Sequence, residues 1–129
     1  MASHLRISGP LFVRSSPRGR VSFSLVVSNL SINDVLVRVK VYGAAFSGFD
    51  TAVTWVQLAD EDFPLESGQT DTLEFRVDKK FDCYQFNVEN SLPNLCFHAA
   101  LYLLSGKQKP LRATPLVVGN EWELIEIKP

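Results

Sequence analysis

The chain has 129 residues, enough for one domain with a hydrophobic core of its own. Hydrophobic residues make up 46% and charged residues 21% of it, which is the balance of a folded globular domain and excludes a disordered tail. The formal net charge is −1, so the chain does not have the excess of basic residues that is typical of nucleic-acid-binding proteins. A net charge this small also does not oppose self-association.

The sequence shows no membrane span and no leader. No run of about 18 apolar residues is present, so we expect no membrane insertion. Residues 1–6 lack the basic start and the apolar stretch of a signal peptide. We therefore expect a cytoplasmic protein unless a leader has been removed. Residues 29–31 match the N-glycosylation sequon, which matters only in a secreted eukaryotic protein.

Apolar and polar residues alternate along the first part of the chain, a pattern typical of strands with one face in a core. Residues 5–14 are a first candidate strand, interrupted by Gly9 and Pro10. Residues 21–27 place apolar side chains on one face and mostly serines on the other. Residues 35–42 repeat the pattern, with four valines facing inward. The sequence predicts a strand in each of these segments.

The second half continues in the same way. Residues 52–58, around a tryptophan, and residues 72–77 are further candidate strands. Residues 96–104 are almost continuously apolar, which favours a central strand covered on both faces. Residues 121–127 form the closing strand. Residues 79–95 are ambiguous: they contain either a strand at residues 84–88 between two loops or a long excursion over one end of the fold.

These segments amount to seven or eight short strands with turn-forming residues between them and no helical periodicity. The pattern predicts a single all-β domain over residues 1–129, an immunoglobulin-like or jelly-roll-like sandwich of antiparallel strands. We expect its core to contain the apolar positions of the alternating runs: Val21, Phe23, Leu25, Val37, Val39, Phe75, Val77 and Leu101.

Three stretches resemble a known group of modules. Residues 21–29 end in an asparagine before a polar loop, and residues 35–42 then alternate valines up to a tyrosine. Residues 64–75 add a Leu-x-x-Gly turn that enters an alternating strand. These features are similar to those of CARDB-type and related immunoglobulin-like modules. The resemblance covers about half of the chain and implies an adhesion, appendage or spacer domain.

No motif for catalysis or cofactor binding is present. His4 and His98 are the two histidines, and neither has the spacing of a zinc ligand set. Cys83 and Cys96 are either one disulfide or two free thiols. Cys83 follows Asp82, whose charge would raise the pKa of the thiol, so we expect both cysteines to be structural. We expect no cofactor and no enzymatic activity.

Asp60, Glu61 and Asp62 form the densest acidic cluster. Loop carboxylates at the edge of a sandwich can hold calcium, but the ordered ligand spacing of a calcium loop is missing. We interpret the cluster as a solvated acidic loop, with calcium binding left open.

Aromatic residues in the expected loops are the candidates for contact with a partner. Phe46 and Phe49 lie in a connection rich in glycine and alanine, and Trp55 follows it. Such rings either plug the end of the core or anchor a protein partner or a second copy of the chain.

Three functions agree with these patterns. The first is a non-enzymatic interaction or appendage module that contacts a protein partner through its surface. The second is a structural subunit that assembles with itself into an oligomer, filament or shell. The third is a carbohydrate-binding module in which Trp55, Trp122 or Tyr102 stacks on sugar rings.

Overall fold

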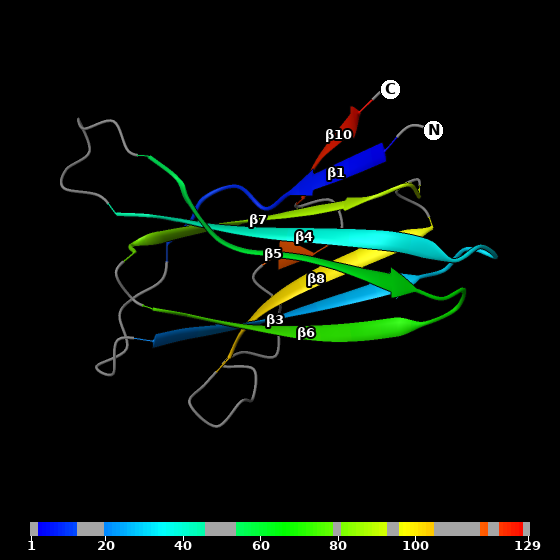
Figure 1. The fold of residues 1–129 in the computed structure, drawn as a ribbon, viewed down its shortest axis with the longest axis horizontal. Helices are drawn as coiled ribbons and strands as arrows, with labels where there is room; N and C mark the ends of the chain where they lie inside the picture. The colour runs from blue at the N-terminus through cyan, green and yellow to red at the C-terminus, as the bar shows by residue number, and fades with distance from the viewer. Residues whose placement is uncertain are drawn as a thin grey trace.

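Two antiparallel β-sheets pack face to face in this computed structural model (Figure 1). The structure describes residues 3–12, 20–45, 54–78, 81–92, 96–104, 117–118 and 122–127. All regular secondary structure in these ranges is β-strand, which confirms the all-β prediction. In chain order the strands are β1 (Ser3–Ile7), β2 (Leu11–Phe12), β3 (Arg20–Asn29), β4 (Val35–Ala44), β5 (Val56–Leu65), β6 (Thr70–Asp78), β7 (Cys83–Asn90), β8 (Phe97–Leu104), β9 (Val117–Val118) and β10 (Glu123–Ile127).

The larger sheet has the order β10-β1-β7-β4-β5, with β2 also paired to β7, and the smaller sheet has the order β6-β3-β8-β9. The pairs are nested, because β4 pairs β5, β3 pairs β6, and β1 and β2 pair β7. An immunoglobulin sandwich keeps its last two strands side by side in one sheet. Here the last two strands, β9 and β10, lie in different sheets, and the nested pairs are those of the jelly-roll alternative.

Aromatic rings from both sheets fill the centre of the core. Phe23 of β3 makes edge-to-face contacts with Tyr84 and Phe86 of β7, at ring-centroid distances of 5.3 and 5.0 Å. Phe75 of β6 contacts Phe86 in the same way at 5.6 Å. Six of the eight core positions expected from the alternation are buried: Phe23, Leu25, Val37, Val39, Phe75 and Leu101. The side chains of Val21 and Val77 lie outside the described residues.

The N-terminal strand is interrupted where the sequence indicated, between β1 and β2. Gly9 adopts a φ of 74°, a conformation that disfavours a side chain. Ser8 keeps this segment attached to β7: its N–H donates to the Phe86 carbonyl at 3.0 Å, and its hydroxyl accepts from the Phe86 N–H at 2.9 Å. The ladder therefore continues past the break through a side chain.

Three sequence-based expectations were wrong in detail. The strand expected at residues 52–58 is β5, Val56–Leu65, and the acidic residues expected in a loop lie within it. Because β5 is an edge strand, polar side chains at its core-facing positions stay in water, which conceals the alternation. His98 of β8 is exposed, so β8 is covered on one face only. For the ambiguous segment, the strand alternative is confirmed: β7 spans Cys83–Asn90, longer than the expected residues 84–88, and its residues alternate between the core and the outer face of the larger sheet.

Replacing Phe23 with alanine should lower the free energy of unfolding by about 3–5 kcal/mol, because the site is fully buried and the rings around it cannot close the cavity. Leu36→Ala is the matched control: Leu36 is 63% exposed, so its loss should change stability by less than about 0.5 kcal/mol. Urea unfolding of both variants measures the difference. Equal destabilisation would contradict the assigned core.

Candidate interaction surface

The aromatic residues proposed as partner contacts do not form a described surface. Phe46 and Phe49 lie outside the described residues, and Trp55, just before β5, is half-buried. The large apolar side chains exposed in the described ranges are aliphatic: Leu30, Ile32, Leu36, Val56 and Leu124. The most exposed is Ile32, at 91%, in the loop between β3 and β4. The signal was present in the sequence, since Leu30 and Ile32 are the apolar residues of an otherwise polar loop.

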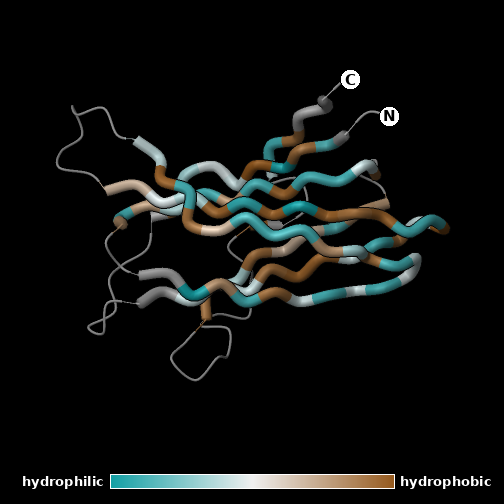
Figure 2. Tube along the Cα trace, viewed as in Figure 1, coloured by the Kyte–Doolittle hydropathy of each residue, from teal (hydrophilic) through white to brown (hydrophobic). Residues whose placement is uncertain are grey.

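We call Leu30 and Ile32 the apolar tip. Leu30 is 59% exposed. The loop that carries both residues projects from one end of the sandwich in Figure 1, and Figure 2 shows its hydrophobic end next to hydrophilic neighbours. An apolar side chain so exposed gains nothing for the fold, because the free energy of burial requires removal from water.

The side chain of Asn29 organises the loop that carries the apolar tip. It is completely buried at the end of β3. Its amide nitrogen donates to the Asn33 carbonyl at 2.8 Å and to the Leu65 carbonyl at 3.0 Å. Its oxygen accepts from the Ser31 N–H at 2.9 Å and from the Ser31 hydroxyl at 2.8 Å. This satisfied and buried amide leaves no room for a glycan, so the sequon at Asn29 cannot be modified in the folded chain.

The neighbouring loop between β5 and β6 holds the tip loop from the other side. The Ser67 N–H donates to the Asp34 carboxylate at 3.0 Å, and the Ser67 hydroxyl donates to the Ser31 carbonyl at 2.7 Å. The Gly68 N–H donates to the Asn29 carbonyl at 2.9 Å, and its φ of 75° explains the glycine. The apolar tip is therefore carried by two loops that are hydrogen-bonded to each other.

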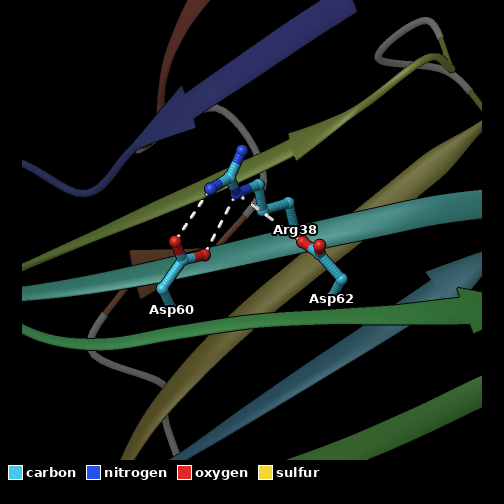
Figure 3. Close-up of polar contacts among 3 residues, drawn as sticks. All are labelled: Arg38, Asp60 and Asp62. Carbon is cyan, nitrogen blue, oxygen red and sulfur yellow. Dashed lines mark hydrogen bonds and ion pairs between the residues drawn. The ribbon is translucent and has the colours of Figure 1, made fainter.

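Strand β4 follows the tip loop, and its outward-pointing side chains form part of the outer face of the larger sheet. Strand register places Arg38 of β4 between Glu89 of β7 and Asp62 of β5. Arg38 does not lie symmetrically between them, as Figure 3 shows. Its Nε and Nη2 donate to the two carboxylate oxygens of Asp60 at 3.0 and 2.8 Å, while Asp62 lies 3.6 Å from Nε. The guanidinium thus binds one carboxylate in bidentate fashion and contacts a second.

This arrangement sets the ionisation of the pair. The hydrogen bonds from Arg38 lower the pKa of Asp60 below its ordinary value, and Asp60 raises the pKa of Arg38 in turn. Alternation along β5 turns Glu61 to the opposite face, beside Val39. Glu61 is therefore separated from Asp60 and Asp62, which both face Arg38, and no group of three candidate metal ligands occurs among the described residues.

An open hollow of about 320 Å³ lies next to Arg38, on the side away from Asp60. Leu36 lies at one end, and Glu89 and Asp62 lie at its two sides; Arg38, Asn90 and Ser91 complete the lining. Leu36 is the second residue of β4, so the hollow begins close to the apolar tip in the chain. We call it the Leu36 hollow.

The remaining sequence candidates lie apart from this surface. Cys83 and Cys96 are free thiols: Cys83 is buried at the start of β7, and Cys96 is half-buried just before β8. Burial, with a smaller contribution from Asp82, raises the pKa of the Cys83 thiol. Trp122 is buried and its Nε1–H donates to the Ala99 carbonyl at 3.0 Å, so its ring cannot stack on a sugar.

Comparisons with models of known protein families, with curated proteins and with solved structures returned no match. The resemblance to CARDB-type modules therefore stays a prediction. Within the described ranges there is also no helix long and apolar enough to cross a membrane.

Replacing Asn29 with alanine should lower the free energy of unfolding by about 2–4 kcal/mol, because buried partners such as the Leu65 carbonyl lose their hydrogen bonds. The Ser31 amide should also exchange faster, since Asn29 is its acceptor. Asn33→Ala in the same loop is the control: its side chain is exposed, so the cost should stay below about 0.5 kcal/mol. Similar costs for the two variants would show that the Asn29 amide does not organise the loop.

Replacing Arg38 with methionine should raise the pKa of Asp60 toward the ordinary aspartate value of about 3.9, because the guanidinium is the main cause of the depression, with a smaller contribution from Lys40. Carboxyl carbon NMR over a pH titration measures it. In the wild type, the stabilisation from this pair is present above that ordinary value and is lost as the pH falls through the lower folded pKa. Arg76→Met on the other sheet should leave Asp60 unchanged. An unaltered Asp60 titration in Arg38→Met would disprove the bidentate pair.

Proposed function

We propose that the protein is a non-enzymatic interaction module that binds a protein partner through its apolar tip. The observation that carries the proposal is the exposure of Ile32, 91%, on a loop held by hydrogen bonds from the buried side chain of Asn29. Apolar side chains that anchor protein interfaces act by entering a pocket of the partner, where they leave water completely.

The hydrogen bonds of the loop support this reading. A flexible segment loses conformational entropy when it binds, and that loss reduces the affinity. Here the Asn29 amide and the Ser67 hydrogen bonds fix the loop before any partner arrives. Ile32 is thus presented at little further entropic cost, which distinguishes it from an isolated exposed aliphatic residue on a strand.

The edge strands β5 and β6, one in each sheet, carry features that disfavour self-assembly by strand addition at these two edges. Glu61 lies on the core-facing side of the edge strand β5, and Pro64 interrupts its backbone donors. Asp71 of β6 pairs with the buried Val27 and so faces the core side of the other edge strand. A strand added to β5 or to β6 would cover one of these carboxylates, and natural sheets use such charges to prevent edge pairing.

Site-specific photo-crosslinking tests the proposal. A benzophenone amino acid at position 32, introduced in the cells from which the sequence comes, should give one adduct with a different protein. The same amino acid at position 72, an exposed position of β6, is the control and should not give that adduct. An adduct of twice the mass of the chain would identify self-assembly instead.

The crosslinked partner, once purified, should bind Ile32→Ser at least about tenfold more weakly than wild type, because a buried isoleucine contributes about 1.5–3 kcal/mol. The melting temperature of the variant should not change, since Ile32 contributes nothing to the core. Unaltered affinity, or no specific adduct at position 32, would refute the proposal.

A further inference from the structure

The Leu36 hollow offers two different surfaces in a defined geometry. Leu36, 63% exposed, pairs with Pro64 across the two strands and provides an apolar end. One row further along the sheet, Glu89 and Asp62 flank Arg38 and provide a carboxylate on each side. A ligand in the hollow would therefore meet an apolar contact at one end and, two residues further along β4, a pair of carboxylates.

The carboxylates of this face outnumber its cations. Asp60, Asp62 and Glu89 face Arg38 and Lys40 on the same side of the larger sheet. Arg38 directs its Nε and Nη2 to Asp60 and approaches Asp62 only at 3.6 Å. Because the guanidinium leans toward Asp60, the space on the Leu36 side is left open beside Glu89 and Asp62. The surplus negative charge therefore lies at the hollow.

We propose that the Leu36 hollow binds an extended segment of the partner protein in which a lysine or arginine lies two positions from an apolar residue. The inference rests on the proposed function, since it names the chemistry of the same partner. The apolar side chain contacts Leu36, and the basic side chain contacts Glu89 and Asp62 on the side of Arg38 that faces away from Asp60.

The spacing follows from strand geometry. Side chains two residues apart on an extended segment point the same way and lie about 6.6–6.8 Å from each other. The row of Leu36 and the row of Arg38 are also two residues apart on β4, so they have the same separation. An extended segment running along β4 would therefore place its two side chains over the two rows at once.

Peptide titrations followed by ¹H–¹⁵N NMR test this inference without the partner. The probe is the blocked pentapeptide Ser-Leu-Ser-Arg-Ser; the controls are Ser-Leu-Ser-Glu-Ser and Ser-Ser-Ser-Arg-Ser. We expect saturable shifts of the amides of Leu36, Glu89 and Ser91 with the probe at millimolar concentration. Both controls should bind more weakly, and added salt should weaken the probe because the charges are exposed.

Glu89→Gln should weaken the probe about two- to fivefold, the effect of losing one exposed ion pair. Glu74→Gln makes the same change on β6 of the other sheet and should have no effect. Leu36→Ser should weaken the probe but not Ser-Ser-Ser-Arg-Ser. Equal binding of the glutamate peptide, equal effects of the two glutamine variants, or shifts confined to other parts of the molecule would overturn the inference.

The two proposals can fail separately. If the partner crosslinked at position 32 binds Glu89→Gln and Asp62→Asn as tightly as wild type, the hollow is not part of its site and this inference fails, while the proposed function stands. If position 32 gives no adduct but the probe binds the hollow as described, the proposed function fails and the hollow remains a peptide site.

Discussion

The buried carboxamide of Asn29 is the interaction on which the candidate surface depends. It ends β3, closes the tip loop through Ser31 and Asn33, and ties that loop to the end of β5 through the Leu65 carbonyl. A buried amide left without these partners would cost more than the hydrogen bonds contribute when made, so the loop has one favoured arrangement. That arrangement leaves Ile32 in water.

A second constraint acts on the outer face of the larger sheet. Arg38 is shared between carboxylates, and the bidentate geometry with Asp60 decides which way its side chain leans. Planar guanidinium groups prefer such paired hydrogen bonds to a single carboxylate over looser contacts with several. The lean opens the Leu36 hollow, so a surface ion pair of little energetic value to the fold still determines the shape and charge of a recess. Core packing thus stabilises the fold, whereas the Arg38–Asp60 ion pair shapes this part of the surface.

The sequence predicted the sandwich because its core strands obey a simple rule. β3 and β4 have one buried face and one polar face, and period-two alternation follows directly, as Phe23 and Val39 show. The rule failed at β5, where Asp60, Glu61 and Asp62 suggested a loop. An edge strand has one paired side only and can carry charges on both faces, so its sequence loses the alternation that identifies a strand.

The candidate surface was harder to predict for a physical reason. Sequence reasoning looked for aromatic rings, and it did not consider Leu30 and Ile32, whose exposure depends on how Asn29 folds the loop. Asn29 was noticed as the end of a strand and as a sequon, whereas its four hydrogen bonds join residues up to 36 positions apart. Long-range pairing of this kind, like the lean of Arg38 toward Asp60, leaves no periodic signal.

The most direct test of the account is the backbone order of the tip loop in the free protein, measured by ¹⁵N relaxation at Ser31 and Ile32. If Asn29 holds the tip in place before a partner binds, the order parameters should be about 0.85, as in the strands. They should fall below about 0.6 in Asn29→Ala. Values below about 0.6 in the wild type would contradict the central claim that the apolar tip is organised in advance.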